Sequence, residues 1–101
     1  MTSDTQKIKE LKVGATSNVS TLSQSIGYVI KSGEGVRIIA AGQSAVNQAN
    51  KAIARSRMFL APSNINVLWN IYFTDIMGSE SSEEGKAPEK ISAIVLESVL
   101  Q

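Results

Sequence analysis

GQSAVNQANKAIARSRMFLAPS, residues Gly42 to Ser63, is the stretch that decides the fold. Small and apolar residues recur in it at spacings of three and four, which is the pattern of a helix with one buried face. Pro62 prevents the helix from continuing, and the alanines would let it lie close to a sheet. The residues that share the apolar side are Ala45, Val46, Ala49, Ala52, Ile53, Phe59 and Leu60.

The polar face of the same helix carries amides and cations but no carboxylate. Its members are Asn47, Gln48, Asn50, Lys51, Arg55 and Arg57. Solvent-exposed helix faces usually mix both signs, because opposite charges one turn apart stabilise a helix. An acid-free face fits a surface that meets a polyanion, which carboxylates would repel. It also fits a surface that meets another subunit, where a buried carboxylate would be costly.

The segments next to this helix predict two strands. VRIIAA, from Val36 to Ala41, is a short β-branched run that is typical of a buried strand. INVLWNIYFTDI, from Ile65 to Ile76, alternates clearly and is the strongest strand pattern in the chain. The side chains that point one way from it are Ile65, Val67, Trp69, Ile71 and Phe73.

Further out, Ile8 to Ala15 and Ile91 to Leu100 predict a first and a last strand. Between the first two strands, Ser17 or Asn18 can cap a helix that ends near Gly33. That helix has one apolar stripe, formed by Val19, Leu22, Ile26, Val29 and Ile30.

The resulting order, β-α-β-α-β-β, predicts an α+β fold. We expect both helices on one face of a four-stranded mixed sheet, with a long C-terminal hairpin. A chain of 101 residues suits one domain, residues 1–101. Within it, residues 1–7 are expected to form a flexible tail and residues 78–90 a mobile acidic hairpin loop.

Composition excludes several kinds of chemistry. The chain has no cysteine and no histidine, so it lacks thiolate ligands, cysteine nucleophiles and the commonest general base. We therefore expect no enzyme activity, cofactor, metal or small-molecule substrate. No signal peptide or membrane-spanning stretch is visible, which favours a cytoplasmic protein without a membrane partner.

The charges are distributed unevenly. Leu11 to Thr74 contains six bases and one acid, a net charge of +5, whereas Asp75 to Gln101 contains six acids and two bases, a net charge of −4. Such an asymmetry indicates a basic surface for a polyanion and an acidic appendage. An excess of five charges is also small enough to arise by chance.

Four segments resemble the stage V sporulation protein S family of bacteria, which belongs to the Alba-like superfamily. They are LKVGATSN at Leu11 to Asn18, IIAAGQSAVNQANKAIAR at Ile38 to Arg55, FLAPSNINV at Phe59 to Val67, and YFTDI at Tyr72 to Ile76. The resemblance implies an Alba-like fold, a homodimer that can associate into tetramers, and binding of DNA or RNA. It implies contacts from Ala15 to Val19, from Ala41 to Ser44, and from the hairpin Met77 to Lys90.

The residues expected to contact nucleic acid combine these loops with nearby polar and basic side chains. They are Lys12, Thr16, Ser17, Asn18, Arg37, Gln43, Ser44, Asn47, Lys51 and Arg55. Free amides at helix N-termini attract phosphate, so loops without basic residues can still bind it. For Lys51 and Arg55, plain solvation remains an alternative to phosphate contact. Phe59 and Trp69 are expected at an oligomer interface; for Trp69, packing in the core and stacking on a base are the alternatives.

The chain also departs from the Alba pattern. Its two helix-leading loops contain no basic residue, and its hairpin loop is acidic. Because Lys and Arg supply most non-specific affinity for nucleic acid, binding should be weakened. The alternative function is an oligomeric Alba-like scaffold or regulatory protein without significant nucleic-acid affinity.

Overall fold

The computed structural model describes residues 7–77 and 90–100 and confirms the predicted α+β fold and order of elements. Most of the expected N-terminal tail and acidic loop lies outside the described residues. The elements are β1 (Ile8–Val13), α1 (Val19–Lys31), β2 (Gly35–Ala40), α2 (Gln43–Leu60), a 3₁₀ turn η1 (Ala61–Ser63), β3 (Val67–Met77) and β4 (Lys90–Leu100).

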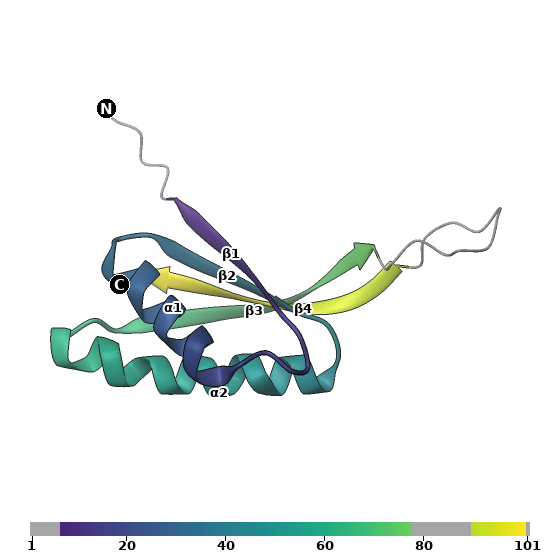
Figure 1. Ribbon diagram of the computed structural model, residues 1–101. Helices are drawn as coiled ribbons and strands as arrows, with labels where there is room; N and C mark the ends of the chain where they lie inside the picture. Colours follow the sequence, from purple (N-terminus) through teal and green to yellow (C-terminus); the bar gives the residue numbers. More distant parts are fainter. Residues whose placement is uncertain (1–6, 78–89, 101) are drawn as a thin grey trace, which may run out of the picture.

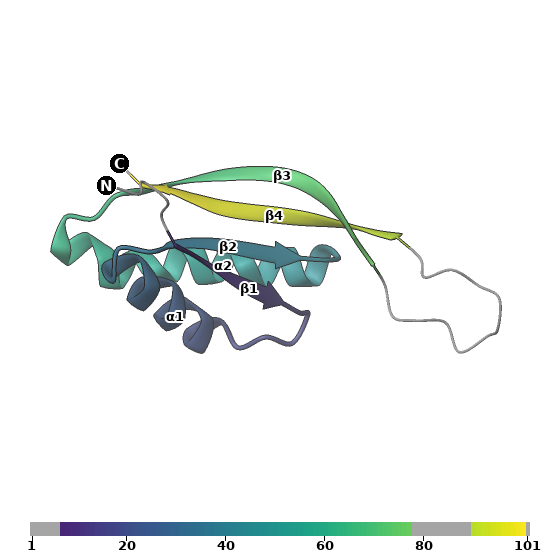
Figure 2. The same cartoon turned by 90° about the horizontal axis from the view of Figure 1, so that it is seen from above.

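The four strands form one mixed sheet in the order β1-β2-β4-β3. β1 and β2 are parallel, as two β-α units require, whereas β4 runs antiparallel to both β2 and β3. β3 and β4 have 11 residues each and β1 and β2 have 6, so the hairpin extends beyond the rest of the sheet (Figure 1). Both helices cover the same face of the sheet (Figure 2). The other face, here called the open face, is covered by neither of these two helices.

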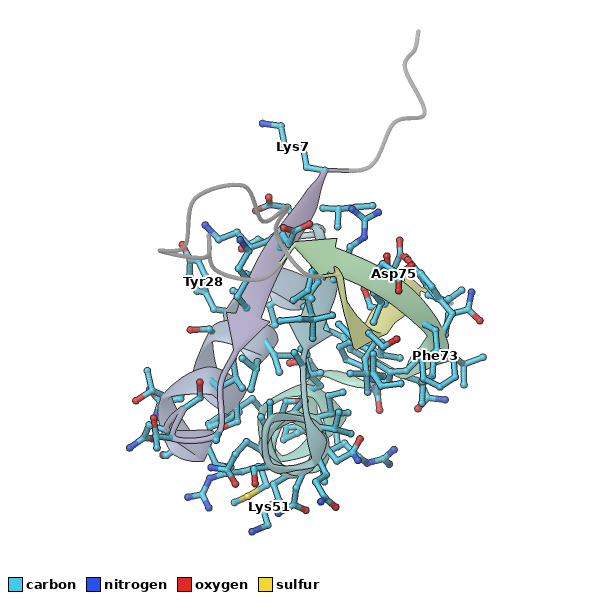
Figure 3. All side chains as sticks on the ribbon, turned by 90° about the vertical axis from the view of Figure 1, so that its right-hand side faces the viewer. Lys7, Tyr28, Lys51, Phe73 and Asp75 are labelled. Atoms are coloured by element: carbon cyan, nitrogen blue, oxygen red, sulfur yellow. The ribbon has the colours of Figure 1, made fainter. Side chains whose placement is uncertain are left out.

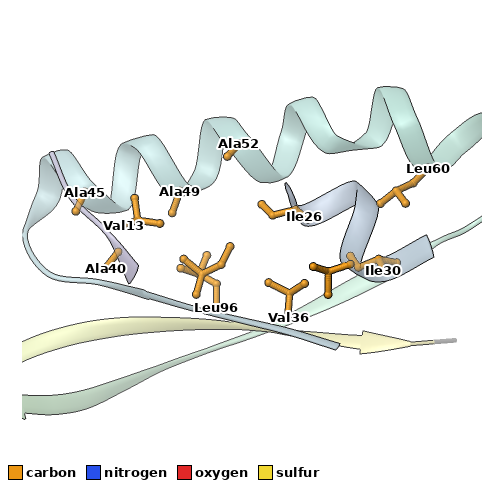
Figure 4. Close-up of a cluster of buried hydrophobic side chains, with 12 residues drawn as sticks. Val13, Ile26, Ile30, Val36, Ala40, Ala45, Ala49, Ala52, Leu60 and Leu96 are labelled. Carbon is orange, nitrogen blue, oxygen red and sulfur yellow. The ribbon is translucent and has the colours of Figure 1, made fainter. Parts of the chain in front are cut away.

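The core lies between the helices and the sheet (Figure 4). Ala45, Ala49 and Ala52 are at most 1% exposed, so the small side chains bring α2 close to the strands as predicted. Leu96 of β4 lies opposite Ile38 of β2 in the centre of this layer. The cluster is formed by Val13, Ile26, Val29, Ile30, Val36, Ile38, Ala40, Ala45, Ala49, Ala52, Leu60 and Leu96.

Two strand ends differ by two residues from the sequence prediction, and each has a local cause. β1 ends at Val13 because Gly14 begins a turn, in which its N–H donates to Ser17 Oγ at 2.9 Å. β3 begins at Val67, not Ile65, because the Ile65 N–H donates to the Leu60 carbonyl at 3.1 Å and so closes the end of α2.

Candidate nucleic-acid interface

The two helices form a layer that contains no carboxylate. Their only charged residues are Lys31 in α1 and Lys51, Arg55 and Arg57 in α2, a net charge of +4. The acids among the described residues lie elsewhere, at Glu10 in β1, Glu34 before β2, Asp75 in β3 and Glu97 in β4. The acid-free face inferred for α2 therefore extends to the whole helical layer.

A polar stripe runs along the outer side of α2. Asn47, Lys51 and Arg55 are spaced by four residues, so they lie on one side of the helix, and all three are exposed. Lys51 projects away from the sheet (Figure 3). Neither basic side chain makes an ion pair with another described residue, so both charges can meet an external anion.

The N-terminus of α2 lies near the beginning of this stripe. Its N-cap is Gly42, at φ 89°, which has no side chain that could cap the helix. Gln43 and Ser44 follow and are exposed. The first backbone N–H groups of a helix have no partner within it and attract anions. The amides at this end of α2 can therefore donate hydrogen bonds to a phosphate oxygen.

The N-terminus of α1 is already occupied by its own cap. Asn18 Oδ1 accepts a hydrogen bond from the Thr21 N–H at 2.9 Å, so Asn18 is the cap of the two candidates that the sequence offers. Gln48 of α2 donates to the Ser17 carbonyl at 2.8 Å, which ties the loop before α1 to α2. The structure thus brings Thr16, Ser17 and Asn18 to the same end of the molecule as Gln43, because β1 and β2 are parallel. The Ser17 carbonyl and the Asn18 Oδ1 therefore already accept hydrogen bonds from within the fold.

Lys12 and Arg37 lie on the open face of the sheet, apart from the α2 stripe. Lys12 is exposed on β1 and is paired in register with Ile39. Arg37 is held by two carboxylates: its Nη2 lies 3.3 Å from Glu97 Oε2, and its Nη1 lies 3.9 Å from Glu10 Oε2. Its charge is largely balanced within the fold.

A hydrogen-bonded row crosses the open face at this point. The Tyr72 hydroxyl donates to Glu97 Oε1 at 2.6 Å, so Glu97 receives both Tyr72 and Arg37. These two donors, Tyr72 foremost, lower the pKa of Glu97. The same bonds raise the pKa of Arg37 and, together with burial, that of Tyr72. The shifts therefore favour a protonated Arg37, a neutral Tyr72 and an ionised Glu97 at neutral pH.

The two predicted interface aromatics are partly buried within the chain. A Cβ placed on Gly27 of α1 would lie 3.2 Å from Phe59 Cβ, so Phe59 occupies the close contact between the two helices. Trp69 packs against the edge of the core and lines a small cavity of about 100 Å³ beneath the end of α2. Their role in oligomerisation stays a prediction.

Sequence reasoning missed the apolar surface next to Trp69. Ile71 and Phe73 point to the same side of β3, yet they are 62% and 78% exposed, because β3 is an edge strand of the sheet. Phe73 borders a hollow of about 450 Å³, whose other wall includes Asn47 and Asn50 of α2. The segment INVLWNIYFTDI could have indicated this surface, because the residues predicted on its inner side are all apolar and the two helices are too few to cover that side along the whole strand.

The order and pairing of the elements define an Alba-like fold. Alba from Thermoplasma volcanium is structurally similar, with a TM-score of 0.62 and 13% sequence identity, over 89% of this chain and 98% of that chain. Residues 9–95 match the family described as stage V sporulation protein S (SpoVS), and the chain belongs to that family. Family and fold together identify a regulatory protein of the SpoVS, Alba-like type.

Two further observations concern function. The SpoVS and Alba-like families are not known as enzymes. Within residues 7–77 and 90–100, neither helix is long and apolar enough to cross a membrane.

Proposed function

We propose that this protein is a non-enzymatic regulator that binds DNA or RNA as a homodimer through phosphate contacts. The observation that carries the proposal is the acid-free helical layer, with four bases and no carboxylate on two helices. Non-specific binding of nucleic acid depends chiefly on cations that neutralise phosphates and release counterions. A surface that bears only one sign of charge suits that task.

The contact surface centres on α2. Lys51 and Arg55 supply charge, Asn47 supplies an amide donor, and the uncapped amides near Gln43 and Ser44 supply a site for a phosphate oxygen. Thr16, Ser17 and Asn18 lie at the same end of the sheet and extend this surface toward β1, whereas Lys12 lies on the open face and is left out of it. Arg37 is left out of the main contacts, because Glu97 and Glu10 already balance its charge.

The exposed side of β3 supports the homodimer. β3 is an edge strand of 11 residues whose only charged side chain is Asp75. Natural proteins rarely leave a long apolar edge uncovered. A second copy packed over Ile71 and Phe73 would bury them, with Asn50 of α2 at the border of the contact. Lys51 projects away from the sheet, so it would stay open for a phosphate group (Figure 3).

This arrangement combines the two explanations for the acid-free face of α2. The side toward β3, which carries Asn50, would meet the partner copy, where amides can pair and carboxylates would be costly. The outer side, which carries Lys51 and Arg55, would meet the polyanion. Carboxylates would be unfavourable on both sides.

Fluorescence anisotropy tests the binding itself. The full-length protein is titrated into labelled single-stranded RNA, single-stranded DNA and duplex DNA at about 50, 100 and 200 mM salt, and affinity should fall steeply as salt rises. Absence of binding to all three at the lowest salt would contradict the proposal. In that case the exposed surface of β3 would favour the oligomeric scaffold instead.

A further inference from the structure

We propose that the edge of β1 is a second interaction surface, which binds an extended acidic peptide segment of a partner protein by strand addition. β1 is the outermost strand of the sheet on the side opposite β3. An edge strand presents unpaired backbone N–H and C=O groups, and an extended peptide can satisfy them. This surface is separate from the α2 stripe and does not depend on nucleic-acid binding.

The direction of the free backbone groups follows from the pairing with β2. The Lys7 carbonyl accepts a hydrogen bond from the Gly35 N–H at 2.8 Å, so Lys7 bonds toward β2. Alternate residues of a strand point their backbone groups to opposite sides. The N–H and C=O groups of Ile8, Glu10 and Lys12 therefore point outward, where an added strand would lie.

A hollow beside this edge can receive a side chain of the added strand. It has a volume of about 330 Å³ and lies between β1 and α1. Leu11 and Val29 give it an apolar floor, and Tyr28 forms a wall. Tyr28 is 75% exposed, although large aromatic side chains usually bury most of their surface. It lies on the side of the molecule opposite Phe73 (Figure 3), so a dimer at β3 would not cover it.

The charge at this edge favours an acidic partner. Residues 7–13 contain Lys7, Lys9 and Lys12 against Glu10 alone, a net charge of +2, and Glu10 already lies near Arg37. Lys9 borders the hollow directly. Glu34 is the acid on its rim. A second copy of this strand would bring the same net charge of +2 and be repelled, which is how lysines protect sheet edges from self-pairing.

A peptide fits this surface better than a nucleic-acid strand does. A base could stack on Tyr28, but a sugar-phosphate backbone cannot pair with the alternating donors and acceptors of an edge strand. The backbone of an extended peptide can pair with β1, and every second side chain of the peptide then points to the face of the sheet on which the hollow lies. We therefore expect an apolar residue at the hollow, with acidic residues beside it.

The test selects peptides from a displayed library of random nine-residue sequences on the full-length protein. Sequences retained by Tyr28→Asp are removed by counter-selection. The selected peptides should alternate apolar and acidic residues. Tyr28→Ala and Lys9→Glu should each weaken the best peptide at least fivefold. Lys51→Ala with Arg55→Ala serves as the matched control and should leave peptide affinity unchanged.

Hydrogen exchange locates the bound peptide. The amides of Ile8, Glu10 and Lys12 should become protected when the selected peptide binds. The proposal fails if selection enriches nothing over the Tyr28→Asp variant, or if protection appears on α2 rather than β1. It also fails if single-stranded DNA binds this edge and displaces the peptide in a Tyr28-dependent manner, because the site would then serve nucleic acid.

Discussion

Replacing Lys51 and Arg55 together by alanine should reduce the salt dependence of nucleic-acid binding while leaving the fold intact. Both side chains are exposed and make no ion pair with another described residue, and alanine is the best helix former. If each residue contacts one phosphate in each protomer, a dimer neutralises about four phosphates through this pair. Each contact contributes about 0.9 to the slope of log K against log salt, so the variant should lose about 3.6 units of slope.

That slope has a large effect on affinity. Over a fourfold rise in salt, from about 50 to 200 mM, 3.6 units correspond to a loss of roughly 150-fold in the wild type that the variant would not show. Anisotropy titrations of both proteins at three salt concentrations measure it. Arg37→Gln is the matched control, because it removes a cation that Glu97 already balances, and its slope should equal that of the wild type. An unchanged slope in the double variant, or an equal loss in Arg37→Gln, would refute the assignment of phosphate contacts to α2.

Three further outcomes are expected. Replacing Ile71 and Phe73 by serine should convert the dimer to a monomer in light scattering while the circular dichroism spectrum stays that of the folded protein, because both side chains are exposed on the chain itself. A dimer that survives would place the interface elsewhere. Leu96→Ala should reduce the free energy of unfolding by about 2–5 kcal/mol in urea titrations, since Leu96 is buried at the centre of the core; a loss well below that range would mean that the core collapses around the site. The hydrogen bonds that lower the pKa of Glu97 stabilise the fold above the ordinary glutamate pKa, and this stabilisation is lost as pH falls through the lowered pKa. Glu97→Gln should therefore flatten the fall in the free energy of unfolding below about pH 5. Parallel pH curves for the two proteins would show that Glu97 is not the cause of that fall.

The fold followed from local patterns that burial enforces. The alanines of α2 and the apolar stripe of α1 each predict a helix with one buried side, and the alternation in β3 predicts a strand, because a residue that faces the core must be small or apolar. The two misplaced strand ends depended on single hydrogen bonds, from Gly14 to Ser17 and from Ile65 to Leu60, which no periodicity encodes.

The site was less accessible to sequence reasoning. Arg37 counts as a free cation in the sequence, and only the register of β2 with β4 shows that it faces Glu97, 60 residues away. The exposure of Phe73 likewise depends on the sheet order, which places β3 at an edge. Pairing between distant strands decides both, and a one-residue slip would reverse every side chain on the strand.

The most direct test of the proposed function is to locate the bound nucleic acid by NMR. Amide chemical shifts of the labelled full-length protein are followed during titration with a short duplex DNA at low salt, and the same titration is repeated with single-stranded RNA. We expect the largest changes at Gln43, Ser44, Asn47, Lys51 and Arg55, and small changes at Arg37 and its neighbours on the open face. Changes centred on the open face of the sheet, or none with either ligand, would contradict the proposal that the acid-free helical layer binds nucleic acid.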